Sequence, residues 1–79
     1  MNGFSNEDTW ALAVLIDNDE YHYKIIGRLA DSLDADHPSA VSTFEDELRE
    51  ILGESYFIDD ADIDLDEVDM DELLRHMQD

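Results

Sequence analysis

Residues 38–53 read Pro-Ser-Ala-Val-Ser-Thr-Phe-Glu-Asp-Glu-Leu-Arg-Glu-Ile-Leu-Gly. Their apolar side chains recur every three or four positions, the spacing that places side chains on one face of an α-helix. That face comprises Val41, Phe44, Leu48, Ile51 and Leu52. Because proline suits the first position of a helix and glycine the position after its end, the pattern predicts a helix over residues 38–52 with this face buried.

A first helix is predicted upstream of that stretch, over residues 5–16. Ser5 or Asn6 can cap its start, and two acidic residues follow in the first turn, where the helix dipole favours negative charge. Apolar residues, among them Trp10 and Val14, cover most faces after that turn. A helix that is apolar all round is normally buried, so we expect this helix at the centre of the fold.

A second helix is predicted over residues 20–33, where Ile25, Ile26 and Leu29 have helical spacing. Gly27 lies in its middle. A glycine inside a helix lowers its stability, and such a residue often marks a packing contact. We therefore expect another backbone to approach closely at Gly27.

The pattern changes after residue 54. From Asp60 to Asp66, aspartate alternates with an apolar residue, and this period of two is typical of a strand. It predicts an extended acidic segment near residues 59–67, with one face on the core and a row of carboxylates on the other.

A short final helix follows that segment. Asp69 is placed to cap it, and Glu72 three residues later completes the pattern of a capping box. The apolar face of this helix comprises Met70, Leu73, Leu74 and Met77.

Together these elements predict one domain over residues 1–79, of the mainly α class. It is a small bundle of three to four short helices with the extended acidic segment beside it. The expected core comprises Trp10, Val14, Ile25, Ile26, Leu29, Phe44, Leu48 and Ile51. A chain of this length buries only a limited share of its surface, so self-association as a homodimer is an open expectation.

Charge is the most unusual property of the sequence. Twenty-three Asp and Glu residues face four Lys and Arg residues, giving a formal net charge of −19 at pH 7. Solubility asks for a net charge of only roughly 2 to 8 in magnitude, and a larger charge destabilises the compact state. Direct binding to nucleic acid or to an anionic membrane needs a basic patch, so we expect neither. A basic protein surface is the favoured partner.

These acidic residues point to imitation of DNA. Each DNA strand carries a phosphate about every 3.4 Å of axis, and alternate residues of an extended segment lie roughly 6.6 Å apart. The aspartates of the extended segment would therefore form a row of charges spaced much like backbone phosphates. Acidic side chains on the helix over residues 38–52, one turn or about 5.4 Å apart, would form a second row of charges. The predicted contact residues are Asp59, Asp60, Asp62, Asp64, Asp66 and Asp69, then Glu45, Glu47 and Glu50, with Tyr23 as an aromatic anchor.

Other chemistry finds little support in the sequence. Asp60, Asp62 and Asp64 match ligand positions of an EF-hand calcium loop, but Leu65 stands where that loop needs glycine. The three histidines lack the spacing of a helical metal site, and there is no cysteine. With neither a nucleophile elbow nor a glycine-rich phosphate loop, we expect no enzyme, no metal and no cofactor.

One motif resembles a known family. The pattern Asn6-x-x-Thr9-Trp10-Ala11-x-x-Val14-x-Ile16-x-Asn18-Asp19-Glu20-x-x-Tyr23 resembles the opening of a family of small phage- and plasmid-borne proteins without an assigned activity. The tail of this chain, rich in Asp and Leu, is similar in kind. The resemblance implies an origin in a mobile element.

By charge and size, the chain is also similar to phage-encoded anti-restriction and anti-CRISPR proteins that imitate DNA. This similarity implies an inhibitor that blocks binding of target DNA, as PAM or duplex, by a type I CRISPR surveillance complex. A restriction enzyme is the second target that it implies. Two further alternatives stay open: an acidic adaptor for a basic protein unrelated to DNA, and a halophilic domain whose charge reflects salt adaptation.

The sequence also indicates a location. Its N-terminus has neither the basic nor the apolar stretch of a signal peptide, and the longest apolar run, Trp10 to Ile16, is too short to span a bilayer. We therefore expect a cytoplasmic protein.

Overall fold

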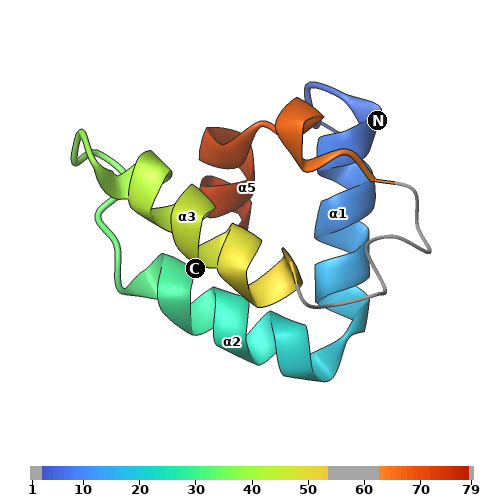
Figure 1. The fold of residues 1–79 in the computed structure, drawn as a ribbon, viewed down its shortest axis with the longest axis horizontal. Helices are drawn as coiled ribbons and strands as arrows, with labels where there is room; N and C mark the ends of the chain where they lie inside the picture. Colours follow the sequence, from blue (N-terminus) through green and yellow to red (C-terminus); the bar gives the residue numbers. More distant parts are fainter. Residues whose placement is uncertain (1–2, 54–62, 79) are drawn as a thin grey trace.

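The computed structural model describes residues 3–53 and 63–78. Within these ranges the chain forms α1 (Glu7–Asn18), α2 (Glu20–Asp31), α3 (Ala40–Gly53), the short 3₁₀ helix η1 (Leu65–Glu67) and α5 (Met70–Met77). No strand occurs among the described residues. The predicted mainly α bundle is therefore confirmed (Figure 1).

Helix α5 lies at the centre of the bundle, where it packs against α1, α2 and α3 (Figure 1). All four of its predicted apolar residues are buried, and Leu73 and Leu74 are completely so. A helix of eight residues takes this place because its apolar side chains form one compact face that three longer helices can cover.

The prediction that the first helix is central was wrong. Its buried residues are Thr9, Leu12, Ala13 and Ile16, which form a single face of α1. Two residues expected in the core lie outside it: Val14 is 36% exposed and Trp10 is partly exposed. The helix carries apolar side chains on more faces than its neighbours cover, so abundance of apolar residues did not identify the buried face.

The rest of the predicted core is correct in part. Ile26, Phe44 and Leu48 are fully buried, as expected. Leu29 and Ile51 are only partly buried against the core, and Ile25 is partly buried outside it. Consecutive residues of α2 differ by 100° around the helix axis. The core therefore covers Ile26, while Ile25 faces the gap between α2 and α3.

A hydrogen-bond network ties the start of α1 to the start of α5. Asn6 caps α1: its Oδ1 accepts the backbone N–H and the hydroxyl of Thr9, both at 2.8 Å. The Thr9 hydroxyl in turn accepts the N–H of Asp69 at 2.8 Å, and the Asn6 side-chain amide donates to the carbonyl of Glu67 at 2.8 Å. Thr9 is the buried polar residue of the described chain, so its bonds join two chain segments within the core.

Asp19 has a similar role between α1 and α2. It is the single residue between the two helices, and its carboxylate accepts the N–H of His22 at 3.1 Å. That hydrogen bond lowers the pKa of Asp19 below its ordinary value. The stabilisation is therefore complete above the ordinary pKa and is lost as the pH falls through the lowered one. Of the motif residues, Asn6 and Asp19 thus cap helices. Thr9 connects α1 to the start of α5.

One predicted helix start differs from the structure, and another agrees with it. Helix α3 begins at Ala40, because Pro38 lies in an exposed turn in which His37 Nδ1 accepts the backbone N–H of Ser39 at 3.1 Å. Asp69 caps α5 as predicted, with its carboxylate accepting the N–H of Glu72 at 3.1 Å.

The capping box at α5 is nevertheless incomplete. The Glu72 carboxylate accepts the backbone N–H of Ser5 at 2.8 Å, while the N–H of Asp69 donates to Thr9. The N-terminal segment therefore supplies the partners that a local capping box would have used.

The predicted extended segment is only partly within the described residues. Asp64 has extended backbone angles, but Leu65–Glu67 form η1, so the alternating pattern does not continue as a strand. The Asp64 carboxylate accepts the N–H of Asp66 at 2.9 Å, and this local bond favours a turn over extended backbone. Asp59, Asp60 and Asp62 lie outside the described residues.

The expected close contact at Gly27 is absent. A Cβ atom built on this residue would meet no atom within 4 Å. Replacing Gly27 by alanine is therefore expected to stabilise the protein by about 0.5–1 kcal/mol, because alanine loses less backbone entropy in a helix. The thermal unfolding midpoint, followed by circular dichroism, should rise by a few degrees.

Gly3→Ala is the control for that substitution. Gly3 has a φ of 92°, a left-handed conformation that disfavours a side chain, so alanine should not stabilise the protein there. A Gly27→Ala midpoint equal to or below that of the wild type would contradict the open space seen beside α2.

Candidate functional site

Arg49 connects two of the predicted contact residues. Its Nε donates to Glu45 on the same helix at 2.9 Å, and its terminal nitrogen donates to Asp66 at 2.9 Å. The hydrogen bond with Glu45, followed by that with Asp66, raises the pKa of Arg49 above its ordinary value. These contacts hold η1 beside α3, and they place a positive charge between the two carboxylates.

Asp64 and Asp69 also make local contacts. Asp64 caps η1, and Asp69 caps α5 while accepting a hydrogen bond from the Ser5 hydroxyl at 3.4 Å. Both side chains lie at the surface, but each serves the local fold. Their predicted role in partner binding stays a prediction.

Glu47 and Glu50 have different surroundings. Both are exposed on α3, and neither makes an ion pair or a hydrogen bond with another described side chain. With Tyr21, Ile25 and Ile51 they line an open groove of about 370 Å³ between α2 and α3, called here the α2–α3 groove.

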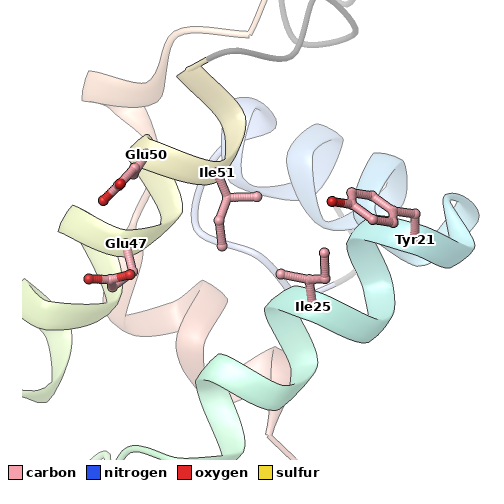
Figure 2. Close-up of a pocket in the computed structure, with 5 residues that line it drawn as sticks. All are labelled: Tyr21, Ile25, Glu47, Glu50 and Ile51. Atoms are coloured by element: carbon pink, nitrogen blue, oxygen red, sulfur yellow. The ribbon is translucent and has the colours of Figure 1, made fainter.

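The α2–α3 groove has apolar and acidic parts. Figure 2 shows Ile25 and Ile51 pointing toward one another across the gap between the two helices. Tyr21 lies on the α2 side of these isoleucines, and Glu47 and Glu50 lie on the α3 side. The groove therefore has a hydrophobic floor between the helices and two acidic residues at its α3 edge, whose carboxylates point away from the isoleucines in Figure 2.

Tyr21 was not among the predicted contact residues, although it lines the α2–α3 groove. It is 67% exposed, and its ring makes an edge contact with the His22 ring at 5.3 Å between centroids. The sequence signal for this exposure was the position of Tyr21, which lies one helical turn before Ile25 and on the side of the helix away from Ile26.

Tyr23, the predicted anchor, lies elsewhere. It is 48% exposed and lines a second groove of about 210 Å³, on the other flank of α2, with Lys24, Arg28 and Met77 among its neighbours. The structure therefore separates Tyr23 from Glu47 and Glu50.

Most basic side chains of the described residues form ion pairs with acidic neighbours. Lys24 pairs with Glu20 at 3.1 Å, and Arg75 pairs with Asp71 at 3.1 Å and with Asp36 at 3.7 Å. Acidic side chains with neither an ion pair nor a hydrogen bond to a described residue are Glu7, Asp8, Asp31, Asp46, Glu47, Glu50 and Glu67. Three of these, Asp46, Glu47 and Glu50, lie on α3.

No group of three or more His, Cys, Asp or Glu side chains in residues 3–53 and 63–78 is arranged to hold a metal ion. None of the helices described is long and apolar enough to cross a membrane.

Comparison of the chain with protein-family models, with curated proteins and with solved structures returns no match.

Proposed function

We propose that this protein is an inhibitor that imitates DNA and occupies the DNA-binding surface of a bacterial defence complex. The observation that carries the proposal is the outer surface of α3, where Asp46, Glu47 and Glu50 are exposed without counter-ions among the described residues. Neighbouring carboxylates without counter-ions repel one another, which costs stability in the free protein. The same charges are favourable against a basic surface.

A DNA-binding groove offers such a surface. Proteins hold the phosphate backbone mainly through Arg and Lys, and these contacts provide most of the sequence-independent affinity. Carboxylates on a rigid helix can pair with the same cations, and the net charge of −19 steers the protein toward them. Inhibition then follows from occupancy alone and requires no catalytic group.

The first proposed target is the PAM or duplex-binding surface of a type I CRISPR surveillance complex, and a restriction enzyme is the second. Both bind duplex DNA through basic surfaces. A competition assay tests the proposal: purified protein is added to each complex with labelled target DNA. Displacement at roughly stoichiometric concentration from one complex supports the proposal, and displacement from none, even at low salt, overturns it.

A pair of charge-reversed variants locates the contact surface. Asp46→Lys with Glu50→Lys is expected to weaken inhibition about tenfold or more, because two attractive contacts become repulsive. Asp31→Lys with Glu67→Lys changes the net charge equally at exposed acids away from the α3 row. This control should keep most of the inhibition. Equal losses in both variants would show that total charge matters and the α3 surface does not.

Salt distinguishes the proposal from the alternatives. A halophilic domain should unfold at low ionic strength, whereas a DNA mimic should stay folded there and bind more tightly. Circular dichroism between about 0.02 and 1 M salt gives the first answer. An acidic adaptor unrelated to DNA would stay folded as well, but it would leave DNA bound in every competition assay.

A further inference from the structure

We propose that the α2–α3 groove binds an arginine side chain of the partner protein. The inference takes its class of partner, a basic protein surface, from the proposed function, and it names the residue type and the place where that residue docks. It rests on the combination of an apolar floor with unpaired carboxylates, which the structure brings together from two helices.

The floor suits the methylene part of a long side chain. Ile25 and Ile51 are partly buried and face each other between the helices (Figure 2). Arginine and lysine side chains lay their aliphatic stems along apolar surface while the charged end stays at the edge. A groove of about 370 Å³ is at the low end of the range for ligand sites, so it suits one protruding side chain better than a large cofactor.

The charges at the edge favour a cation. Glu47 and Glu50 are one helical turn apart on α3, and the described residues that line the groove include no basic side chain. An anionic occupant such as a nucleic-acid phosphate would meet two carboxylates without a compensating charge. A cation gains two charge-assisted contacts and displaces no internal partner, since neither glutamate is paired with another described residue.

Arginine fits this arrangement better than lysine. Its planar guanidinium has five donors, enough to reach two carboxylates at once, and it is more weakly hydrated than an ammonium group. Arginine therefore loses less hydration free energy than lysine when it lies beside the two isoleucines. Tyr21 also lines the groove on the α2 side, where its ring offers a second apolar surface to the stem.

Nuclear magnetic resonance can observe this site directly. Three blocked tripeptides with Gly at both ends carry arginine, lysine or citrulline in the middle. They are titrated into the full-length protein with labelled isoleucine methyl groups at about 0.15 M salt, where distant charges are screened. Saturable shifts of the Ile25 and Ile51 signals are expected with arginine, weaker shifts with lysine and none with neutral citrulline. The buried Ile16 and Ile26 report that the fold is unchanged.

Two variants complete the test. Glu47→Gln with Glu50→Gln keeps the shape of the groove and is expected to weaken arginine binding about tenfold. Asp46→Asn with Glu67→Gln removes the same charge outside the groove and should bind as the wild type does. Shifts that are equal for arginine and citrulline, or unchanged in the first variant, would overturn the groove inference.

The outcomes separate this inference from the proposed function. If the Glu47→Gln/Glu50→Gln variant loses both the methyl shifts and the displacement of DNA, both proposals are supported. If it still displaces DNA and the wild type shows no arginine-specific shift, the groove inference fails and the proposed function stands. If arginine binds in the groove but no defence complex releases DNA, the groove inference holds and the proposed function is overturned.

Discussion

Replacing Phe44 by alanine is expected to remove most of the stability of this protein. Phe44 lies on α3 with no exposed surface, in the core cluster that also contains Leu73 and Leu74 of α5. Truncating a buried phenylalanine costs about 3–5 kcal/mol, from lost burial and from the cavity that remains. A domain of 79 residues has a total stability of roughly 4–12 kcal/mol, and its charge places it toward the lower part of that range.

Urea unfolding followed by circular dichroism measures this loss. Val41→Ala is the matched control, because Val41 is on the same helix but only partly buried. It should cost far less than Phe44→Ala. If both substitutions lower the free energy of unfolding equally, the assignment of the buried face of α3 is wrong.

Replacing Thr9 by valine is expected to destabilise the protein by about 1–3 kcal/mol, although the two side chains have nearly the same shape. Valine cannot accept the N–H of Asp69 or donate to Asn6, both of which contact the Thr9 hydroxyl at 2.8 Å. The loss leaves a polar group without a partner at the part-buried start of α5, where the penalty is larger than the value of an average hydrogen bond.

A double-mutant cycle checks the origin of that loss. Asn6→Ala removes the cap of α1 and the contact with Glu67, and it removes the acceptor of the Thr9 hydroxyl, the hydrogen bond that Thr9→Val also removes. The combined variant should therefore lose less free energy of unfolding than the sum of the two single variants. Thr9→Ser keeps the hydroxyl and should be the milder change. Strict additivity, or a greater loss for serine than for valine, would argue against the network.

The acidic residues that the structure describes differ in their physical roles. Some, such as Asp19 and Asp69, cap helices, and others, such as Glu45 and Asp66, share a cation. A further group, of which Glu47 and Glu50 on α3 are members, has neither an ion pair nor a hydrogen bond with another described residue. Partner binding by this last group breaks no internal contact, and this is why both proposals rest on it.

Much of the fold could be predicted from the sequence because helices are encoded locally. The spacing of Phe44 and Leu48 and the caps at Asn6 and Asp69 depend on residues within one or two turns. The buried face of α5 was predicted completely, since its apolar residues occupy one side only. Where a helix is apolar on several sides, as α1 is, periodicity does not identify the covered side, and Val14 was misplaced for that reason.

The candidate site depended on tertiary structure. The sequence determined the charge, the helices and the presence of Glu47 and Glu50 on the outer part of α3. Only the packing of α2 beside α3 brings Tyr21 and Ile25 into the same groove as those glutamates. Likewise, only the position of η1 allows Asp66 to form an ion pair with Arg49. Contacts between residues 17 or more positions apart depend on how faces pair in space, and the spacing of residues along the chain carries no record of that pairing.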